Sequence, residues 1–216
     1  MHFGINVRPG KHGLKLNKDS YAIINTKSSY TIKMSKAEYT DDTYKFYTDE
    51  WAKTYQAAIL ENYDLNMKYY SLLDKDKFNK EVIGFIERYK FTEVDDLNYY
   101  KDKAGYYLMV LDDYCQVYVG TCKNFYERIK NHWKRVKPFD RLLFPMWNIK
   151  KSRLSIDSFR SLDTKRLYIL ESDDTYSMED KYIKYFSDKF ICNRVGGGTM
   201  ENVFRLIATN KERGLE

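Results

Sequence analysis

The sequence predicts an α+β protein, in which a small antiparallel three-stranded sheet is flanked by helices and preceded by a mixed β and helical N-terminal domain. Short runs rich in β-branched and aromatic residues alternate with segments of helical periodicity. The composition, with 43% hydrophobic and 31% charged residues, is that of a globular protein. A chain of 216 residues can bury one large core or two small ones, and we expect two domains, 1–100 and 101–216.

The N-terminal domain is predicted to begin with strands and to continue with helices. Tyr21–Asn25 and Tyr30–Met34 are short strand candidates on either side of a turn. Between residues 49 and 90, apolar residues recur at helical spacing. They are Trp51, Tyr55, Ile59, Phe78, Val82, Phe85 and Ile86. The charged and polar stretch 95–103 is a predicted linker to the second domain.

The second domain is predicted to contain the sheet. Its strands are predicted over 106–111, 115–119 and 166–170, with a last short strand over 189–192. Helices are predicted over 124–136 and 177–187. The stretch 138–163 has no clear period, and we expect irregular structure there with some helix.

Positive charge is concentrated in the second domain. The net charge of the chain is +6, and residues 123–166 hold 13 basic and 4 acidic residues. Such a basic stripe favours a phosphate-bearing partner, although solvated lysine-rich faces are also common. We expect DNA as the partner, with RNA as the open alternative. The expected phosphate contacts are Lys123, Lys130, Lys134, Arg135, Lys137, Lys150 and Lys151, with Arg141 and Arg153 extending the track.

Neither a membrane segment nor a disulfide framework is predicted. No apolar run reaches the roughly 18 residues of a membrane span, and residues 1–18 lack the apolar stretch of a signal peptide. We therefore expect a cytoplasmic protein without a membrane partner. The three cysteines, Cys115, Cys122 and Cys192, are odd in number and poorly spaced for zinc, and we expect buried thiols.

Two tyrosines, Tyr107 and Tyr118, lie eleven residues apart on the first two predicted strands. If the turn is centred on Asp112 and Asp113, the two tyrosines face each other directly across a hairpin, about 5 Å apart. The phenols then lie side by side on one face of the sheet. An aromatic pair that only packs is the alternative.

Arg128 and His132 are four residues apart on the helix predicted after the hairpin. They lie at the edge of its apolar stripe, which contains Phe125, Ile129 and Trp133. Side chains at such a margin can lean over the end of a sheet, toward the two tyrosines. A surface arginine and a half-buried structural histidine are the alternatives.

Glu179 lies early in the last predicted helix. It can supply the one carboxylate that Mg²⁺ needs when waters and phosphate oxygens complete the coordination shell. The alternatives are an interaction of Glu179 with the helix N-terminus, or Asp180 as the ligand. Phosphodiester hydrolysis also needs a proton acceptor for the attacking water. A phenol is a poor acceptor unless cations such as Arg128 or a metal lower its pKa.

An ordered set of motifs runs through the second domain: Gly105-Tyr106-Tyr107, Tyr118-Val119-Gly120, Arg128, His132, Glu179 and Asn193. This set resembles the GIY-YIG nuclease family over about 105–198. The resemblance implies that Tyr107 activates water, that Tyr118 supports it by hydrogen bonding, and that Arg128 polarises the scissile phosphate. It also implies that His132 assists Tyr107, that Glu179 holds Mg²⁺ or Mn²⁺, and that Asn193 braces the site.

The chain departs from the family pattern at two places. Tyr106 stands where the family usually has isoleucine, and the stretch between His132 and Glu179 is long enough for a substrate-specific insertion. The expected function is that of a metal-dependent endonuclease, a hydrolase cutting DNA, of restriction, mobile-element or defence type. The alternatives are a catalytically inactive nucleic-acid-binding protein with this fold and an unrelated basic domain. The first hundred residues are expected either to read the substrate or to cap the nuclease module.

Overall fold

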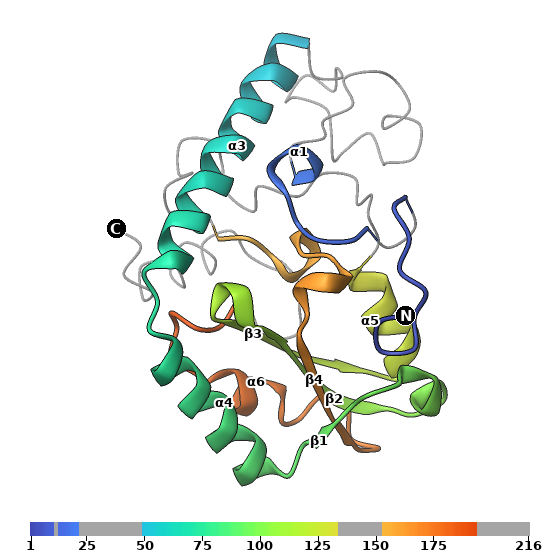
Figure 1. Ribbon diagram of the computed structural model, residues 1–216. Coiled ribbons are helices and arrows are strands. Elements are labelled where there is room, and N and C mark those ends of the chain that lie inside the picture. The colour runs from blue at the N-terminus through green and yellow to red at the C-terminus, as the bar shows by residue number, and fades with distance from the viewer. Residues whose placement is uncertain (11–12, 22–48, 134–152, 194–216) are drawn as a thin grey trace.

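The computed structural model describes residues 1–10, 13–21, 49–133 and 153–193 (Figure 1). At its centre is an antiparallel sheet with the strand order β1-β4-β2-β3. The strands are β1 (Thr92–Glu93), β2 (Gly105–Leu111), β3 (Gln116–Cys122) and β4 (Arg166–Glu171). The α+β class is confirmed. The described part of the sheet has four strands rather than three, because the two-residue strand β1 pairs with β4.

Helices precede, connect and follow the strands. The α-helices are α1 (Lys18–Tyr21), α3 (Asp49–Ser71), α4 (Lys75–Tyr89), α5 (Phe125–His132) and α6 (Glu179–Ile183). The short 3₁₀ helices are η1 (Leu97–Tyr100), η2 (Asp112–Tyr114), η4 (Ile156–Ser158) and η5 (Ser161–Asp163). The helical pattern predicted over 49–90 is confirmed as two helices, α3 and α4. Asp74 separates them, because its side chain accepts hydrogen bonds from the first amides of α4.

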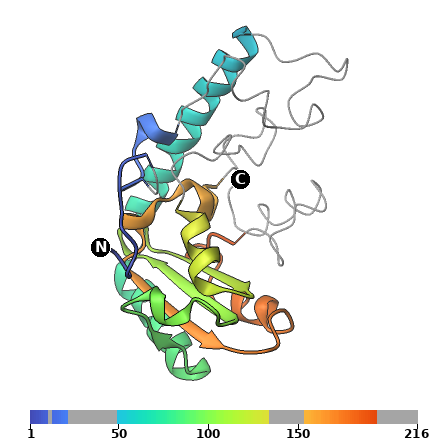
Figure 2. The same ribbon diagram turned by 90° about the vertical axis from the view of Figure 1, so that its right-hand side faces the viewer.

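The sheet is covered on both faces, as the two ribbon views show (Figure 1, Figure 2). Alternate residues of β2 point to opposite faces, and all seven are buried. One face packs against α5 through Tyr107, Met109 and Leu111. The opposite face packs against α4 and α6 through Tyr106, Leu108 and Val110. Buried on that second side are the predicted core residues Phe78, Val82 and Phe85 of α4, with Ile86 partly buried. The side chains of Trp51, Tyr55 and Ile59 lie outside the described part.

The β2–β3 hairpin has a different register from the predicted one. Its four-residue turn consists of η2 followed by Cys115 in a left-handed conformation, with φ 49°. The turn is therefore centred one residue later than predicted, and Tyr107 pairs with Gly120 while Met109 pairs with Tyr118. The prediction that the two tyrosines face each other directly is wrong. The shift of two positions nevertheless leaves both tyrosines on the same face.

The N-terminal region differs from its predictions in two places. Tyr21 ends helix α1 and does not begin a strand. The rest of that strand candidate and the candidate over 30–34 lie outside the described residues. The stretch 95–103, predicted as a linker, contains η1, and the side chain of Leu97 is fully buried in the core that contains Tyr107.

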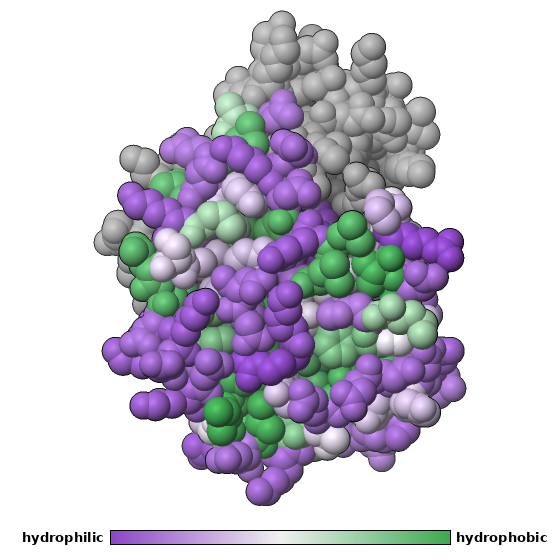
Figure 3. All heavy atoms as spheres, viewed as in Figure 1, coloured by the Kyte–Doolittle hydropathy of each residue, from purple (hydrophilic) through white to green (hydrophobic). Residues whose placement is uncertain are grey.

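The C-terminal part of the described chain covers the free edge of β3. Helix α6 is shorter than predicted. The strand predicted over 189–192 is reduced to one parallel bridge between Ile191 and Val117. The thiols of Cys115, Cys122 and Cys192 are buried, as predicted. On the outer surface, hydrophilic residues surround scattered apolar patches (Figure 3). No helix in the described ranges has both the length and the apolar character needed to cross a bilayer.

Candidate active site

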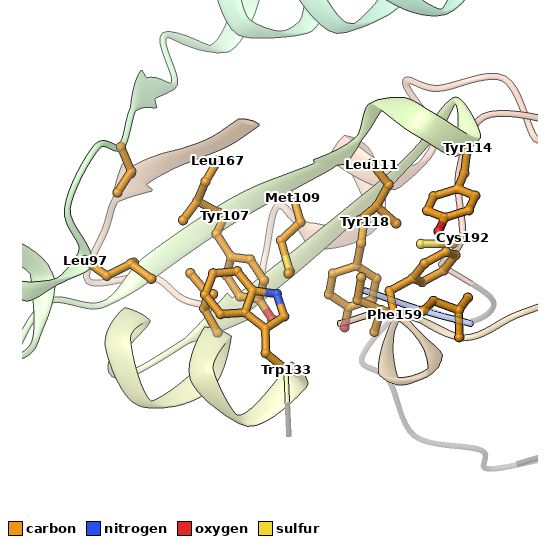
Figure 4. Close-up of a cluster of buried hydrophobic side chains, with 14 of the residues drawn as sticks. Leu97, Tyr107, Met109, Leu111, Tyr114, Tyr118, Trp133, Phe159, Leu167 and Cys192 are labelled. Carbon is orange, nitrogen blue, oxygen red and sulfur yellow. The ribbon is translucent and has the colours of Figure 1, made fainter. Parts of the chain in front are cut away.

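Tyr107 lies over a glycine of the neighbouring strand. A Cβ atom added to Gly120 would come within 2.3 Å of Cζ of Tyr107, so only glycine leaves room for the ring. Tyr118 is the diagonal neighbour, and the centroids of the two tyrosine rings are 6.0 Å apart. Both rings extend from the sheet toward α5 (Figure 4). The motif Tyr118-Val119-Gly120 therefore supplies both the neighbouring phenol of Tyr107 and the glycine that leaves room for the Tyr107 ring.

Helix α5 begins at Phe125 because the side chain of Asn124 accepts a hydrogen bond from Glu127 N at 3.0 Å. Phe125 and Ile129 are fully buried, and Trp133 follows the helix with 1% exposure. This apolar stripe fixes the rotation of the helix on the sheet.

His132 is 3% exposed and lies between Tyr107 and a residue that the sequence did not indicate. Its Nε2 atom is 2.7 Å from the Tyr107 hydroxyl. Its Nδ1 atom is 2.8 Å from Oδ1 of Asp157, in η4. The sequence prediction missed Asp157, which falls in the stretch without a clear period, 25 residues beyond His132. No local pattern marks such a contact.

Arg128 lies close enough to both phenols to act on them electrostatically. Burial raises the pKa of Tyr107 well above its ordinary value, and Arg128 opposes this increase. Burial likewise raises the pKa of Tyr118, again opposed by Arg128. The arginine therefore acts in the predicted direction, but desolvation outweighs it. Both tyrosines are protonated at neutral pH in this environment.

Three of the predicted catalytic residues meet in one cleft of roughly 410 Å³. These are Tyr118 from β3, Arg128 from α5 and Glu179 from the start of α6. The other lining residues are Thr121, Cys122, Lys123, Asn124, Glu127, Asn131 and Tyr176. Tyr107 and His132 do not line this cleft but lie behind it. Burial raises the pKa of the Cys122 thiol to about 12, so this thiol stays protonated.

Asn193 braces the outer edge of β3. Its Oδ1 atom accepts a hydrogen bond from Val119 N at 2.8 Å, and its Nδ2 atom donates one to Val119 O at 2.6 Å. The side-chain amide of Asn193 thus forms the two hydrogen bonds with Val119 that a neighbouring strand would otherwise form. Asn193 therefore holds the strand that contains Tyr118 through backbone hydrogen bonds.

The predicted phosphate contacts are only partly described. Lys123 lines the cleft. Lys130 forms an ion pair with Glu127 at 2.6 Å and lies over the ring of Tyr126. Lys134, Arg135, Lys137, Arg141, Lys150 and Lys151 lie outside the described residues. The prediction for Arg153 is wrong, since its side chain is 1% exposed and donates to the Tyr69 hydroxyl at 2.9 Å.

Among the residues that line the cleft, Glu179 is a carboxylate that could hold a magnesium or manganese ion. The described residues contain no group of three or more His, Cys, Asp or Glu side chains arranged to hold a metal. Glu179 is 7% exposed and faces the cleft, which has room for waters and a phosphate. Mg²⁺ is commonly bound through one or two carboxylates together with waters and substrate phosphates.

Comparison with known proteins adds no relative. No family model matches the chain, and no curated protein or solved structure matches it. A functional assignment therefore depends on the motif set and on the geometry of the cleft.

Proposed function

We propose that this protein is a divalent-metal-dependent endonuclease that hydrolyses phosphodiester bonds in DNA. The observation that carries the proposal is the meeting of Tyr118, Arg128 and Glu179 in one cleft, with Tyr107 bonded to His132 directly behind it. A phenol, a guanidinium and a carboxylate are the groups needed for water activation, phosphate binding and metal binding. The resemblance of the motif set to GIY-YIG nucleases supports the same chemistry.

Arg128 is the proposed phosphate ligand. Its pKa is raised above the ordinary value despite its burial, so the guanidinium is charged at neutral pH. Because Arg128 lines the cleft and also acts electrostatically on Tyr107, a phosphate bound to it would lie on the side of the cleft nearest the buried phenol. Guanidinium groups suit this task because they can donate two parallel hydrogen bonds to phosphate oxygens.

Tyr107 is the proposed proton acceptor for the attacking water, and because it is buried behind the cleft, this role requires that the water reach it past Tyr118 and Arg128 when substrate is bound. A buried phenol with a raised pKa cannot ionise on its own near neutrality. His132 is placed to take its proton, since Nε2 lies 2.7 Å from the hydroxyl. Arg128 would then stabilise the phenolate that remains. Tyr118, which faces the cleft, is proposed to orient the water or the phosphate.

Glu179 is the proposed ligand of Mg²⁺ or Mn²⁺. Such an ion, when bound, polarises a phosphate oxygen and stabilises the leaving oxygen. The lining of the same cleft includes Tyr176, a residue that is 66% exposed and suits stacking on an unpaired base. A restriction, mobile-element or defence role is consistent with a nuclease of this size.

A plasmid assay tests the proposal. Supercoiled DNA incubated with the purified protein and Mg²⁺ or Mn²⁺ is expected to become nicked or linear, and EDTA is expected to prevent this. An Arg128→Ala variant purified in parallel excludes a contaminating nuclease. Binding that falls with salt, by about 0.9 log units per log unit for each phosphate contacted, but without cleavage would favour an inactive nucleic-acid-binding protein instead. An RNA of the same sequence separates the two substrates.

A further inference from the structure

Asp157 completes a chain of hydrogen bonds that begins at a hydroxyl inside the protein. Tyr107 is fully buried and His132 is 3% exposed, whereas the side chain of Asp157 is 48% exposed. The two links of the chain are 2.7 Å, from Tyr107 Oη to His132 Nε2, and 2.8 Å, from His132 Nδ1 to Asp157 Oδ1. The chain therefore connects the buried phenol to the protein surface through Asp157, which is not among the residues that line the cleft.

The backbone around Asp157 is fixed by a buried arginine. Arg160 is 1% exposed, and its Nη1 atom donates to the carbonyl oxygens of Asp157 at 3.1 Å and Ser158 at 2.7 Å. Ser158 is itself 1% exposed, and the neighbouring Ile156 is 6% exposed. A carboxylate on a turn anchored in this way has a defined position, which a carboxylate on a solvated loop would lack.

The contact with Asp157 determines which nitrogen of His132 carries a proton. An ionised carboxylate only accepts hydrogen bonds, so Nδ1 of His132 must be the donor. In the neutral ring Nε2 then has a lone pair, and the Tyr107 hydroxyl donates to it. The other tautomer would direct an N–H group at Tyr107 and could not receive its proton.

We propose that Asp157 is a positioning residue of the reaction, which holds His132 in the tautomer that accepts the proton of Tyr107. This inference rests on the proposed nuclease function. The Tyr107 O–H bond breaks and an Nε2–H bond forms, while the attacking water gives a proton to the Tyr107 oxygen. The hydroxide oxygen bonds to phosphorus as the bond to the leaving oxygen breaks. That oxygen takes a proton from solvent, and the imidazolium, paired with Asp157, later returns one to solvent.

A kinetic comparison tests the effect on the reaction. Asp157→Ala and Asp157→Asn are expected to lower kcat roughly 10- to 100-fold, the usual cost of losing a partner that orients a functional histidine, with KM changed less than about twofold. In a His132→Ala background the same substitutions are expected to have no further effect, because the two residues act as one unit. Asp64→Asn is the matched control, since Asp64 is an exposed aspartate on α3 that pairs with Lys18 of α1, and it is expected to retain full activity.

A spectroscopic measurement tests the positioning itself, independently of cleavage. The chain has three histidines, so His132 can be assigned by comparison with a His132→Ala variant. Long-range ¹H–¹⁵N correlation spectra of the full chain are expected to show His132 with its proton on Nδ1. In Asp157→Ala the signal should move toward the other tautomer, while thermal unfolding shows that the variant is folded.

The outcomes separate the two proposals. A wild-type His132 with its proton on Nε2, or an Asp157→Ala variant with unchanged tautomer and unchanged kcat, would overturn the role of Asp157. A large loss of kcat that persists in the His132→Ala background would also overturn it, since Asp157 would then act elsewhere. If the tautomer depends on Asp157 but no metal supports cleavage, the positioning is established and the nuclease function is the part that fails.

Discussion

Two regions of the molecule contribute to the candidate site in different ways. The hairpin and α5, residues 105–133, supply two tyrosines, an arginine and a histidine from regular elements that follow one another closely. The segment 153–164 contains no regular element longer than three residues, yet it supplies Asp157 and the buried Arg160. The first region brings reactive groups together, and the second fixes the orientation of one of them.

The N-terminal residues form hydrogen bonds to the second region. Leu16 N donates to the buried Asp163 at 2.8 Å, Leu14 O accepts from Leu162 N at 2.7 Å, and His2 Nε2 lies 2.8 Å from Thr164 O. A side chain at Gly13 would approach Cδ of Arg160 to 2.9 Å. These contacts join the described N-terminal residues to the segment that contains Asp157 and Arg160.

The largest expected effect comes from the cleft carboxylate. Glu179→Gln keeps the shape of the side chain but removes the charge that would hold Mg²⁺, and cleavage is expected to fall below detection with the protein still folded. The neighbouring Asp180 is exposed and serves as the matched control. Cleavage rates and thermal unfolding of Glu179→Gln and Asp180→Asn would be measured together. If Asp180→Asn loses activity and Glu179→Gln retains it, the metal assignment moves to Asp180.

The second-largest effect is expected for Tyr107, whose hydroxyl is bonded to His132. Tyr107→Phe retains the ring over Gly120 but removes the hydroxyl bonded to His132. A general base typically contributes 10²- to 10⁴-fold, so kcat is expected to fall within that range while the unfolding midpoint changes little. Tyr118→Phe, on the same face but without the histidine bond, is expected to lose less. Equal losses in the two variants would argue against a special role for the Tyr107–His132 pair.

The contrast between the regions also explains what the sequence could predict. The tyrosines, Arg128 and His132 lie on adjacent elements, where strand alternation and helix spacing already place them near one another. The register failed because Cys115 adopts a left-handed conformation, which non-glycine residues seldom do. The role of Asp157 could not be predicted, because it depends on a contact with His132, 25 positions away in the sequence. The burial of Leu97 could not be predicted either, because it depends on how the whole core packs.

Gly120→Ala is expected to disturb the first region without removing any reactive group. The added methyl group would lie 2.3 Å from the Tyr107 ring, and forced repacking of this kind costs roughly 1–3 kcal/mol. The free energy of unfolding, measured by denaturant titration, should fall by that amount. In a Tyr107→Ala background the same substitution should cost much less, because the ring that it meets is gone. An equal cost in both backgrounds would show that the glycine is needed for its backbone instead.

The smallest expected effect is an ion pair that joins the N-terminal segment to the hairpin turn. Lys15 Nζ lies 2.7 Å from Asp113 Oδ2, and this hydrogen bond lowers the pKa of Asp113. A lowered carboxyl pKa in the folded state stabilises the protein above the unfolded-state pKa of about 3.9 and loses that contribution as the pH falls through the folded-state value. Asp113→Asn should therefore lower the free energy of unfolding at pH 7 by less than about 1 kcal/mol, since the pair is exposed. The difference from the wild type should shrink as the pH is lowered below about 3.9, and it should be smaller in a Lys15→Met background, where Lys165, 3.8 Å from Asp113 Oδ2, is the remaining partner. A difference that stays constant with pH would mean that Asp113 supports the turn through its shape and not through its charge.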